Sequence, residues 1–222
     1  MYCIVFDLDG TLIDLPVDIE AAREEISAMF SQRGYHQPIR PILTAINEAA
    51  ASVADSDEEI YPLILAARRI LDAAEVKAAK DATLRPGVLE VLASLKRQGI
   101  PMGIVTNNSR ACISKALEVL ECSIQDFVIS TRDDVRRPKP APDGIVRIAP
   151  SLCEEGETLW FVGDSPVDVS AAVAANPQVA ATVKAVAILG PRSTKVQLLA
   201  AGPCIVHASL AEAVDSIEKT AS

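Results

Sequence analysis

The sequence lacks the features that mark several large classes of protein. Its five cysteines include no C-x-x-C pair, which disfavours a zinc site, and their odd number disfavours a disulfide framework. We therefore expect buried free thiols in a reducing cytosol. No basic stretch followed by an apolar run begins the chain, and no uncharged apolar span of about 18 residues occurs in it. We expect no signal peptide, no membrane partner and a cytoplasmic location.

An excess of positive charge is also missing. The formal net charge is -9, which argues against binding to nucleic acid or to anionic membranes. A phosphate-binding loop of the form G-x-x-x-x-G-K-[ST] does not occur, so a kinase of that type is disfavoured. What the chain does have is 222 residues, half of them hydrophobic, which is enough for one large domain or for a core with an insert. We expect a monomer or a weak homodimer.

Short apolar runs rich in β-forming residues alternate with helical patterns along most of the chain. Such runs are typical of strands buried on both faces, and their alternation with helices predicts a parallel sheet flanked by helices. The expected strands span 2–6, 100–105, 127–129, 159–162, 184–189 and 204–206. The expected helices span about 86–98, 110–121, 141–149, 166–175 and 208–219. The fold class is therefore α/β, with a Rossmann-like parallel sheet.

One long segment interrupts this alternation. From about 17 to 82 only helical periodicity is visible, for example in the apolar spacing of Ile19, Ile26 and Phe30. This pattern predicts a small helical bundle inserted after the first strand, with 83–87 as the return linker. We expect a core made of 1–15 and 84–222 and a helical cap made of 16–83.

Polar clusters follow four of the expected strands. In an open parallel sheet, ligands bind beyond the carboxyl ends of the strands, so clusters far apart in the sequence can meet in one pocket. The clusters are Asp7, Asp9, Gly10 and Thr11; Thr106, Asn107, Asn108 and Ser109; Lys139 in R-R-P-K-P-A-P-D; and Gly163, Asp164, Ser165 and Asp168.

The residue types in these clusters point to phosphoryl chemistry. Asp7, Asp9 and Asp164 would place three carboxylates together, and hard oxygen ligands around a small site suit Mg²⁺. Lys139 adds positive charge, and Thr106 adds a hydroxyl donor at a strand end; together these groups can bind a phosphoryl group. A carboxylate in line can act as nucleophile, and a second acid two residues on can protonate the leaving group and activate water.

Each cluster also has an ordinary structural interpretation. Asp-x-Asp and Gly-Asp can be turn chemistry, Lys139 can be an exposed loop lysine, and Asn108 or Ser109 can cap the following helix. We expect Asp14 to be a local capping acid rather than a metal ligand. It is the complete set in this order that favours a phosphoryl-transfer site.

The four motifs resemble those of the haloacid dehalogenase-like phosphohydrolases. The matching stretches are D-L-D-G-T-L from Asp7, T-N from Thr106, K-P-A-P-D from Lys139 and G-D-S-P-V-D from Gly163 to Asp168. The likeness covers essentially the whole chain and includes a helical cap inserted after the first motif. Within the family the chain is most similar to phosphoglycolate phosphatases, which implies a Mg²⁺-dependent enzyme acting on a small phosphorylated metabolite.

The resemblance implies a role for each matched residue. Asp7 would be the nucleophile and a Mg²⁺ ligand, and Asp9 the general acid and base, ligating Mg²⁺ through its backbone carbonyl. Asp164 would bind Mg²⁺ directly, with Asp168 supporting it. The remaining positions would surround the substrate phosphate: Gly10 and Thr11 through their backbone, Thr106 and Asn107 as donors, and Lys139 as the cation that neutralises Asp7 and the phosphate.

Other activities stay open at this point. Dehalogenase members lack the second acid, which is present here as Asp9, and phosphonate-cleaving members read D-x-A-G-T. Sugar phosphomutases typically carry a histidine shortly after the first motif, and this chain has none there, so hydrolysis is favoured over a mutase. A phosphorylation-switched signalling domain and a non-catalytic binding protein on a similar fold are the two alternatives from other classes.

A small anionic substrate would need cations near its second charge. The insert contains several, and two more arginines lie near Lys139, so one or two of these could reach the pocket. Leu15 and Pro16 stand where the family usually has a Ser or Thr after the first motif, which could alter the cap hinge. The candidate cations are Arg23, Arg40, Arg68, Arg69, Lys77, Lys80, Arg136 and Arg137.

Overall fold

A six-stranded parallel sheet forms the centre of the computed structural model, which describes residues 2–120, 126–190, 193–202 and 204–221. The strand order is β5-β4-β1-β6-β7-β8, and β1 pairs with β4 on one side and β6 on the other. This confirms the α/β class. The strands are β1 (Tyr2–Phe6), β4 (Met102–Val105), β5 (Val128–Ser130), β6 (Thr158–Gly163), β7 (Thr182–Ile188) and β8 (Cys204–His207).

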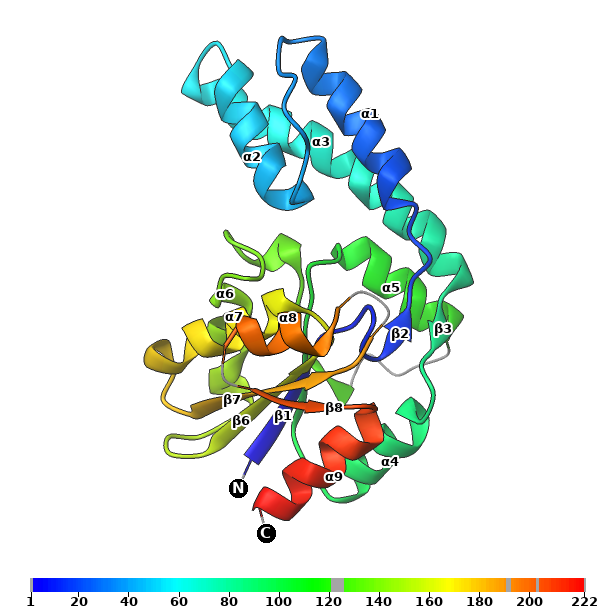
Figure 1. Cartoon of the computed structure of the whole chain (residues 1–222), viewed down its shortest axis with the longest axis vertical. Coiled ribbons are helices and arrows are strands. Elements are labelled where there is room, and N and C mark those ends of the chain that lie inside the picture. The colour runs from blue at the N-terminus through cyan, green and yellow to red at the C-terminus, as the bar shows by residue number, and fades with distance from the viewer. Residues whose placement is uncertain (1, 121–125, 191–192, 203, 222) are drawn as a thin grey trace.

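Helices cover both faces of this sheet (Figure 1). Because side chains alternate along β1, Ile4 and Phe6 pack into one hydrophobic cluster and Cys3 and Val5 into another. The first cluster is completed by α4 (Val88–Arg97), α5 (Arg110–Val119) and α9 (Leu210–Ala221). The second is completed by α6 (Asp143–Ile148), α7 (Pro166–Ala175) and α8 (Lys195–Ala200). Both faces of the sheet therefore pack against buried apolar residues, as the unbroken apolar strand sequences indicate.

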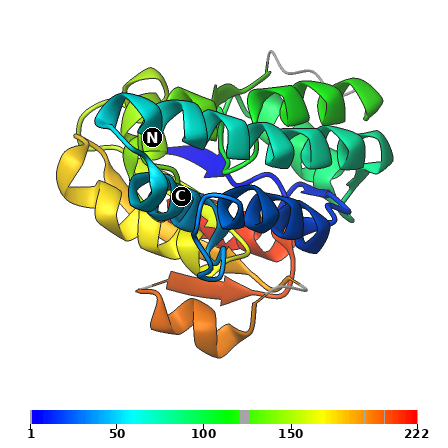
Figure 2. The same cartoon turned by 90° about the horizontal axis from the view of Figure 1, so that it is seen from above.

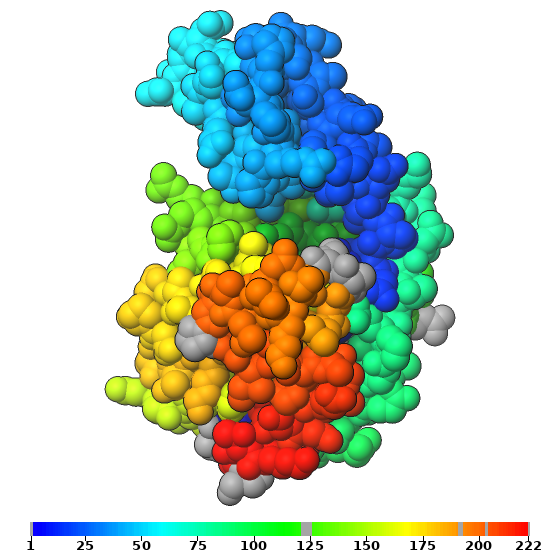
Figure 3. All heavy atoms as spheres, in the orientation of Figure 1, coloured from blue at the N-terminus to red at the C-terminus, as the bar shows by residue number. Residues whose placement is uncertain are grey.

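The segment between β1 and α4 is helical, as its periodicity predicts. Helices α1 (Ile19–Ser31), α2 (Ile42–Val53) and α3 (Asp57–Ala78) share a hydrophobic cluster of their own, which includes Ile26, Phe30, Ile46 and Leu71. Figures 1 and 3 show this helical insert above the carboxyl ends of the strands. Helix α3 has 22 residues and reaches from that cluster down to α5. The division into a core of 1–15 and 84–222 and a cap of 16–83 stays a prediction.

Several elements differ from the sequence expectations. Strands β2 (Ile13–Asp14) and β3 (Thr83–Leu84) pair antiparallel where the chain leaves and re-enters the core, and two residues each give too little pattern to predict. Helix α8 was also not expected; Figure 2 shows it with β8 at one edge of the core. The short helical turns are η1 (Ala79–Asp81), η3 (Arg132–Asp134), η4 (Ala149–Ser151) and η5 (Asn176–Gln178).

The cysteine expectation is wrong at one pair. Cys3 in β1 and Cys153 after η4 are joined by a disulfide, although they lie 150 residues apart in sequence. Their Cα atoms are 6.1 Å apart because the chain before β6 returns beside β1. Cys112 and Cys204 are free thiols, and Cys122 lies outside the described residues. Within the described ranges, no helix combines the length and the apolar character needed to cross a bilayer.

Candidate active site

Three buried carboxylates meet beyond the carboxyl ends of β1 and β6. Asp7 follows β1, Asp164 follows β6, and Asp168 lies in the first turn of α7. One carboxylate oxygen from each lies within 4.8 Å of the others, and their exposed fractions are 6%, 1% and 1%. Such a concentration of like charge in a buried place requires nearby cations.

Lys139 supplies one of those cations. Its Nζ atom lies 2.6 Å from Oδ1 of Asp7 and 2.6 Å from Oδ1 of Asp168, and the side chain is almost completely buried. Burial opposes the charge of Lys139, but the carboxylates of Asp168 and Asp7 raise its pKa above the ordinary value. The alternative interpretation of Lys139 as an exposed loop lysine is therefore excluded.

Burial also dominates the ionisation of Asp7. It raises the pKa of Asp7 to about 7, against the lowering effect of Lys139, and the charge of Asp168 raises it further. A carboxylate must be ionised to act as a nucleophile. One ammonium group does not balance three carboxylates, so a divalent cation in this place would favour the ionised form of Asp7.

The acidic group fits a hard divalent cation. Carboxylate oxygens are the ligands that Mg²⁺, Ca²⁺ and Mn²⁺ prefer. Two glycines leave the space that the acids occupy: a Cβ atom on Gly163 would lie 2.5 Å from Cγ of Asp168, and one on Gly190 would lie 2.7 Å from Oδ2 of Asp164. The chain therefore keeps both carboxylates close to its backbone, at the end of β6 and just after β7.

Asp168 is held by its own helix as well as by Lys139. Its Oδ2 atom accepts hydrogen bonds from the backbone N–H and the hydroxyl of Ser165, at 3.0 and 2.5 Å. This is a capping box at the start of α7. With both oxygens engaged, Asp168 positions Lys139 and supports the acidic group.

Asp9 lies apart from the three clustered carboxylates. Its Oδ1 atom accepts a hydrogen bond from the backbone N–H of Leu15 at 3.0 Å, and the residue is partly exposed at the pocket. Gly10, at φ 91°, turns the chain after it, and its N–H donates to the carbonyl of Ile13. Thr11 is fully buried, and the structure records no hydrogen-bond partner for its hydroxyl.

The loop after β4 brings Thr106 and Asn107 to the same cavity. The hydroxyl of Thr106 donates to the Asn108 side chain, and the Asn107 amide pairs with the backbone of Lys139 in both directions, at 2.9 Å each. Asn107 thus fixes the lysine loop. Ser109 caps α5 by accepting from the N–H of Cys112, as its sequence position predicts.

A buried ion-pair cluster that the sequence did not reveal joins the helical insert to this loop. Arg132 is fully buried, and its Nη1 atom lies 2.6 Å from Oε1 of Glu75 and 2.7 Å from the carbonyl oxygen of Asn107. Its Nη2 atom contacts Asp72. Glu75 also accepts from the N–H of Ser109 at 3.0 Å. Burial acts against the charge of Arg132, but Glu75 and Asp72 raise its pKa above the ordinary value.

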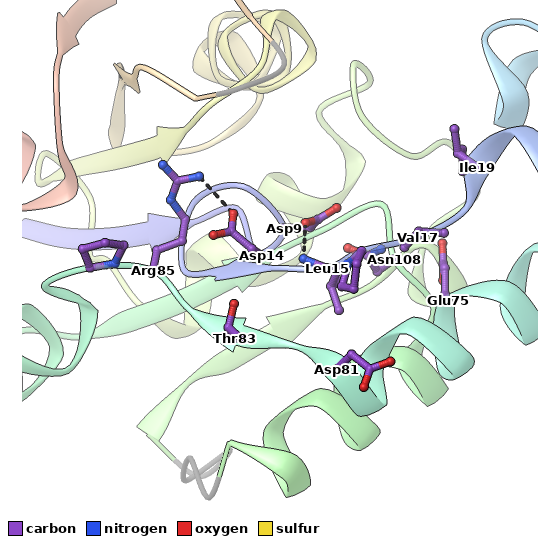
Figure 4. A pocket seen from close by; sticks show the side chains of 12 residues that line it. Asp9, Asp14, Leu15, Val17, Ile19, Glu75, Asp81, Thr83, Arg85 and Asn108 are labelled. Atoms are coloured by element: carbon purple, nitrogen blue, oxygen red, sulfur yellow. Dashed lines mark hydrogen bonds and ion pairs between the residues drawn. The ribbon is translucent and has the colours of Figure 1, made fainter.

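A cavity of about 410 Å³ connects these groups with the helical insert. On its core side it is lined by Asp7, Asp9, Thr106, Lys139 and Asp164, so the predicted clusters do meet in one place. Figure 3 shows the insert directly above this part of the core. A second, larger hollow of about 850 Å³ begins beside Asp9 and runs under the linker between β1 and α1 (Figure 4).

The comparisons with known proteins agree with this geometry. A family model described as haloacid dehalogenase-like hydrolase matches residues 4–182. The chain belongs to this hydrolase family. A phosphoglycolate phosphatase from Escherichia coli O157:H7 is 28% identical over 195 residues, covering 78% of this chain and 77% of that protein.

Solved structures show the same fold. A hydrolase from Pseudomonas syringae has a TM-score of 0.71 at 22% identity, with both chains covered completely. A family member from Deinococcus radiodurans R1, solved with bound phosphate and sodium, has a TM-score of 0.62 at 21% identity and covers 99% of this chain and 96% of its own. At these identities the likeness establishes architecture, and function must be argued from the site.

Two expectations about charged residues need correction. Asp14 does not cap the chain locally; it forms an ion pair with Arg85 at 3.2 Å across β2 and β3 (Figure 4). One or two of eight candidate cations were expected to reach the pocket, but among the described residues none of the eight lines the 410 Å³ cavity. Arg23 and Arg40 pair with Glu20, and Arg137 pairs with Asp143.

Proposed function

We propose that this hydrolase is a Mg²⁺-dependent phosphomonoesterase that acts on a small phosphorylated metabolite through a phosphorylated Asp7. The observation that carries the proposal is the buried contact of Lys139 with Asp7, beside Asp164 and Asp168. A nucleophilic carboxylate, a cation-binding acidic group and a fixed ammonium are the groups that phosphoryl transfer requires. The names of the curated relatives make phosphoglycolate the reference ester.

In the first step, an oxygen of Asp7 attacks phosphorus as the bond to the leaving alcohol breaks. Asp9, at the mouth of the pocket, gives the proton that the leaving oxygen takes up. The second step reverses these roles: Asp9 removes a proton from water, water attacks phosphorus, and Asp7 is released as a carboxylate. Inorganic phosphate and the free alcohol are the products.

The other groups stabilise charge on the transferring phosphoryl group. Lys139 offsets the charge of Asp7 and of the phosphoryl oxygens, and the hydroxyl of Thr106 would turn from Asn108 to donate to a phosphoryl oxygen. The backbone of Gly10 and Thr11, directly after Asp9, would lie beside the phosphate, although neither residue is among the lining residues of the 410 Å³ cavity. A Mg²⁺ ion bound by Asp7, Asp164 and the carbonyl of Asp9, with Asp168 in support, would neutralise further charge on the phosphoryl oxygens.

We expect EDTA to abolish phosphate release from a general ester such as phenyl phosphate, and added Mg²⁺ to restore it. Asp164→Asn should bind Mg²⁺ about tenfold or more weakly in calorimetry, because one charged ligand is lost. Asp215→Asn, an exposed acid on α9, is the matched control and should behave as wild type. Full turnover in EDTA would contradict the metal requirement.

We expect Gly163→Ala to weaken Mg²⁺ binding without any change of ligand. The new Cβ atom would meet the Asp168 carboxylate at about 2.5 Å, so Asp168 and the Lys139 ammonium must shift. We anticipate a loss of about tenfold in affinity, measured by calorimetric titration with Mg²⁺. Wild-type affinity in the folded variant would show that the position of Asp168 does not matter for the metal.

A further inference from the structure

The helical insert presents a mostly apolar wall to the active-site cavity, with Glu75 of α3 as its one charged residue among those the structure describes. Apart from Glu75, the lining residues from α1, α2, α3 and the segment before α2 are Ile19, Pro41, Ile42, Leu43, Thr44 and Leu71, and these six are here called the cap wall. Of these described residues, only Thr44 has a polar side chain. A leaving group that points away from Asp7 toward the insert therefore meets mostly carbon surface.

Positive charge is scarce throughout the lining of this cavity. Among the described lining residues, Lys139 is the one cation, and its ammonium already contacts Asp7 and Asp168. Glu75 lies at the same cavity, and its charge is balanced by Arg132 from behind. A second anionic group on the substrate would find no unengaged cation here.

The hollow beside Asp9 does not supply one either. Its described lining contains Asp9, Asp14, Glu75 and Asp81 against a single cation, Arg85. Figure 4 shows the Arg85 guanidinium extending to the Asp14 carboxylate, with which it pairs. A carboxylate that entered this hollow would approach four acids.

Several cations of the insert are paired with acids outside the cavity, and Arg68, whose Nε atom has no hydrogen-bond partner in the structure, does not line it either. Arg23 bonds to Glu20 and to the carbonyl of Ile39, and Arg33 pairs with Glu59. Lys77 borders a separate hollow between α1 and α3. Arg68 lies one helical turn before Leu71 on α3, is partly buried and is outside the cavity lining.

We infer that the preferred ester has an uncharged leaving alcohol with carbon surface, and that a carboxylated ester such as phosphoglycolate is a poor substrate. This inference rests on the proposed phosphatase function. The cap wall would bury the carbon surface of such an alcohol, whereas a carboxylate would lose water there without gaining an ion pair. The relatives' named substrate would then not carry over to this chain.

The test compares three esters with purified protein and Mg²⁺: 2-phosphoglycolate, the neutral 2-hydroxyethyl phosphate of similar length, and butyl phosphate. We expect kcat/KM for 2-hydroxyethyl phosphate to exceed that for 2-phosphoglycolate by about tenfold or more, and butyl phosphate to be better still. A higher kcat/KM for 2-phosphoglycolate would overturn the inference while leaving the phosphatase function intact.

Variants make the comparison specific to the cap wall. Leu43→Lys should raise kcat/KM for 2-phosphoglycolate by about tenfold relative to butyl phosphate, and the uncharged Leu43→Gln should not. Arg68→Met should leave the order of the three esters unchanged. A selective loss of 2-phosphoglycolate hydrolysis in Arg68→Met would identify Arg68 as its carboxylate partner and contradict the inference.

Binding gives a readout that does not depend on turnover. Calorimetry on Asp7→Asn with Mg²⁺ should show tighter binding of butyl phosphate than of 2-phosphoglycolate. The opposite order would overturn the inference even if no ester were hydrolysed. Absence of hydrolysis of all three esters and of phenyl phosphate by the wild-type protein would instead reject the proposed function.

Discussion

Asp7→Asn is expected to lower kcat for phenyl phosphate by about 10⁴-fold or more, because the amide is not a nucleophile toward phosphorus. The change keeps the size of the side chain and leaves Lys139 paired with Asp168. It also removes one negative charge from a crowded site, since Asp7, Asp164 and Asp168 lie within 4.8 Å of one another. We therefore expect the variant to fold and to be at least as stable as wild type, which separates lost chemistry from lost structure.

The measurement is a steady-state assay of phosphate release, with a urea unfolding curve for each protein. Asp215→Asn is the control for the conversion of an aspartate elsewhere on the surface, and its activity should not change. Activity of Asp7→Asn within about tenfold of wild type would mean that another group attacks phosphorus.

Arg132→Met is expected to lower the free energy of unfolding by about 3–5 kcal/mol, because it leaves the Glu75 carboxylate buried without its cation. Glu75 is 4% exposed and its Oε1 atom lies 2.6 Å from Arg132. The bond from Arg132 to the carbonyl oxygen of Asn107 is lost as well. Because Asn107 holds the backbone of Lys139, we also expect a lower kcat in the folded fraction.

Two further variants distinguish a buried charge cluster from simple packing. Arg110→Met breaks an exposed ion pair with Asp134 and should lower the free energy of unfolding by less than about 1 kcal/mol. The double variant Arg132→Met/Glu75→Gln should have a free energy of unfolding about 1 kcal/mol or more above that of Arg132→Met, because it no longer carries the unpaired Glu75 carboxylate. Equal costs for Arg132→Met and Arg110→Met would show that the cluster contributes no more than a surface pair.

The sequence was sufficient to predict the groups that share one physical cause, the meeting of strand ends in a parallel sheet. Asp7, Thr106, Lys139 and Asp164 each follow or approach a strand end, and β1, β4, β5 and β6 are adjacent. Their positions were therefore predictable from the alternation of strands and helices. Their chemical roles stay predictions until they are measured.

The Arg132 cluster could not be predicted in the same way. Glu75 and Arg132 are 57 residues apart, and their contact depends on which face of α3 turns toward the core. Helical periodicity predicts which face of α3 is apolar. It does not predict how far along its axis α3 is placed relative to α5. In the sequence, Arg132 lies in the charged loop that leads to Lys139, and such a position fits an exposed side chain as well as a buried one.

The disulfide and the charges around the cavity were missed for a related reason. Cys3 and Cys153 meet only because β1 and β6 are neighbours, and a Cα–Cα distance has no local sequence signal. The cations of the insert were counted by composition, whereas the structure shows that Arg23, Arg33 and Arg40 have partners within the insert. Whether a cation of the insert is available to a substrate depends on its side-chain partners in the folded bundle, which composition does not reveal.

The most direct measurement is mass spectrometry of the enzyme quenched in acid during turnover with Mg²⁺ and phenyl phosphate. We predict one added phosphoryl group on the peptide that contains Asp7, and none in Asp7→Asn. Phosphate attached to a different residue, or steady turnover with no phosphorylated peptide at any quench time, would contradict nucleophilic catalysis by Asp7.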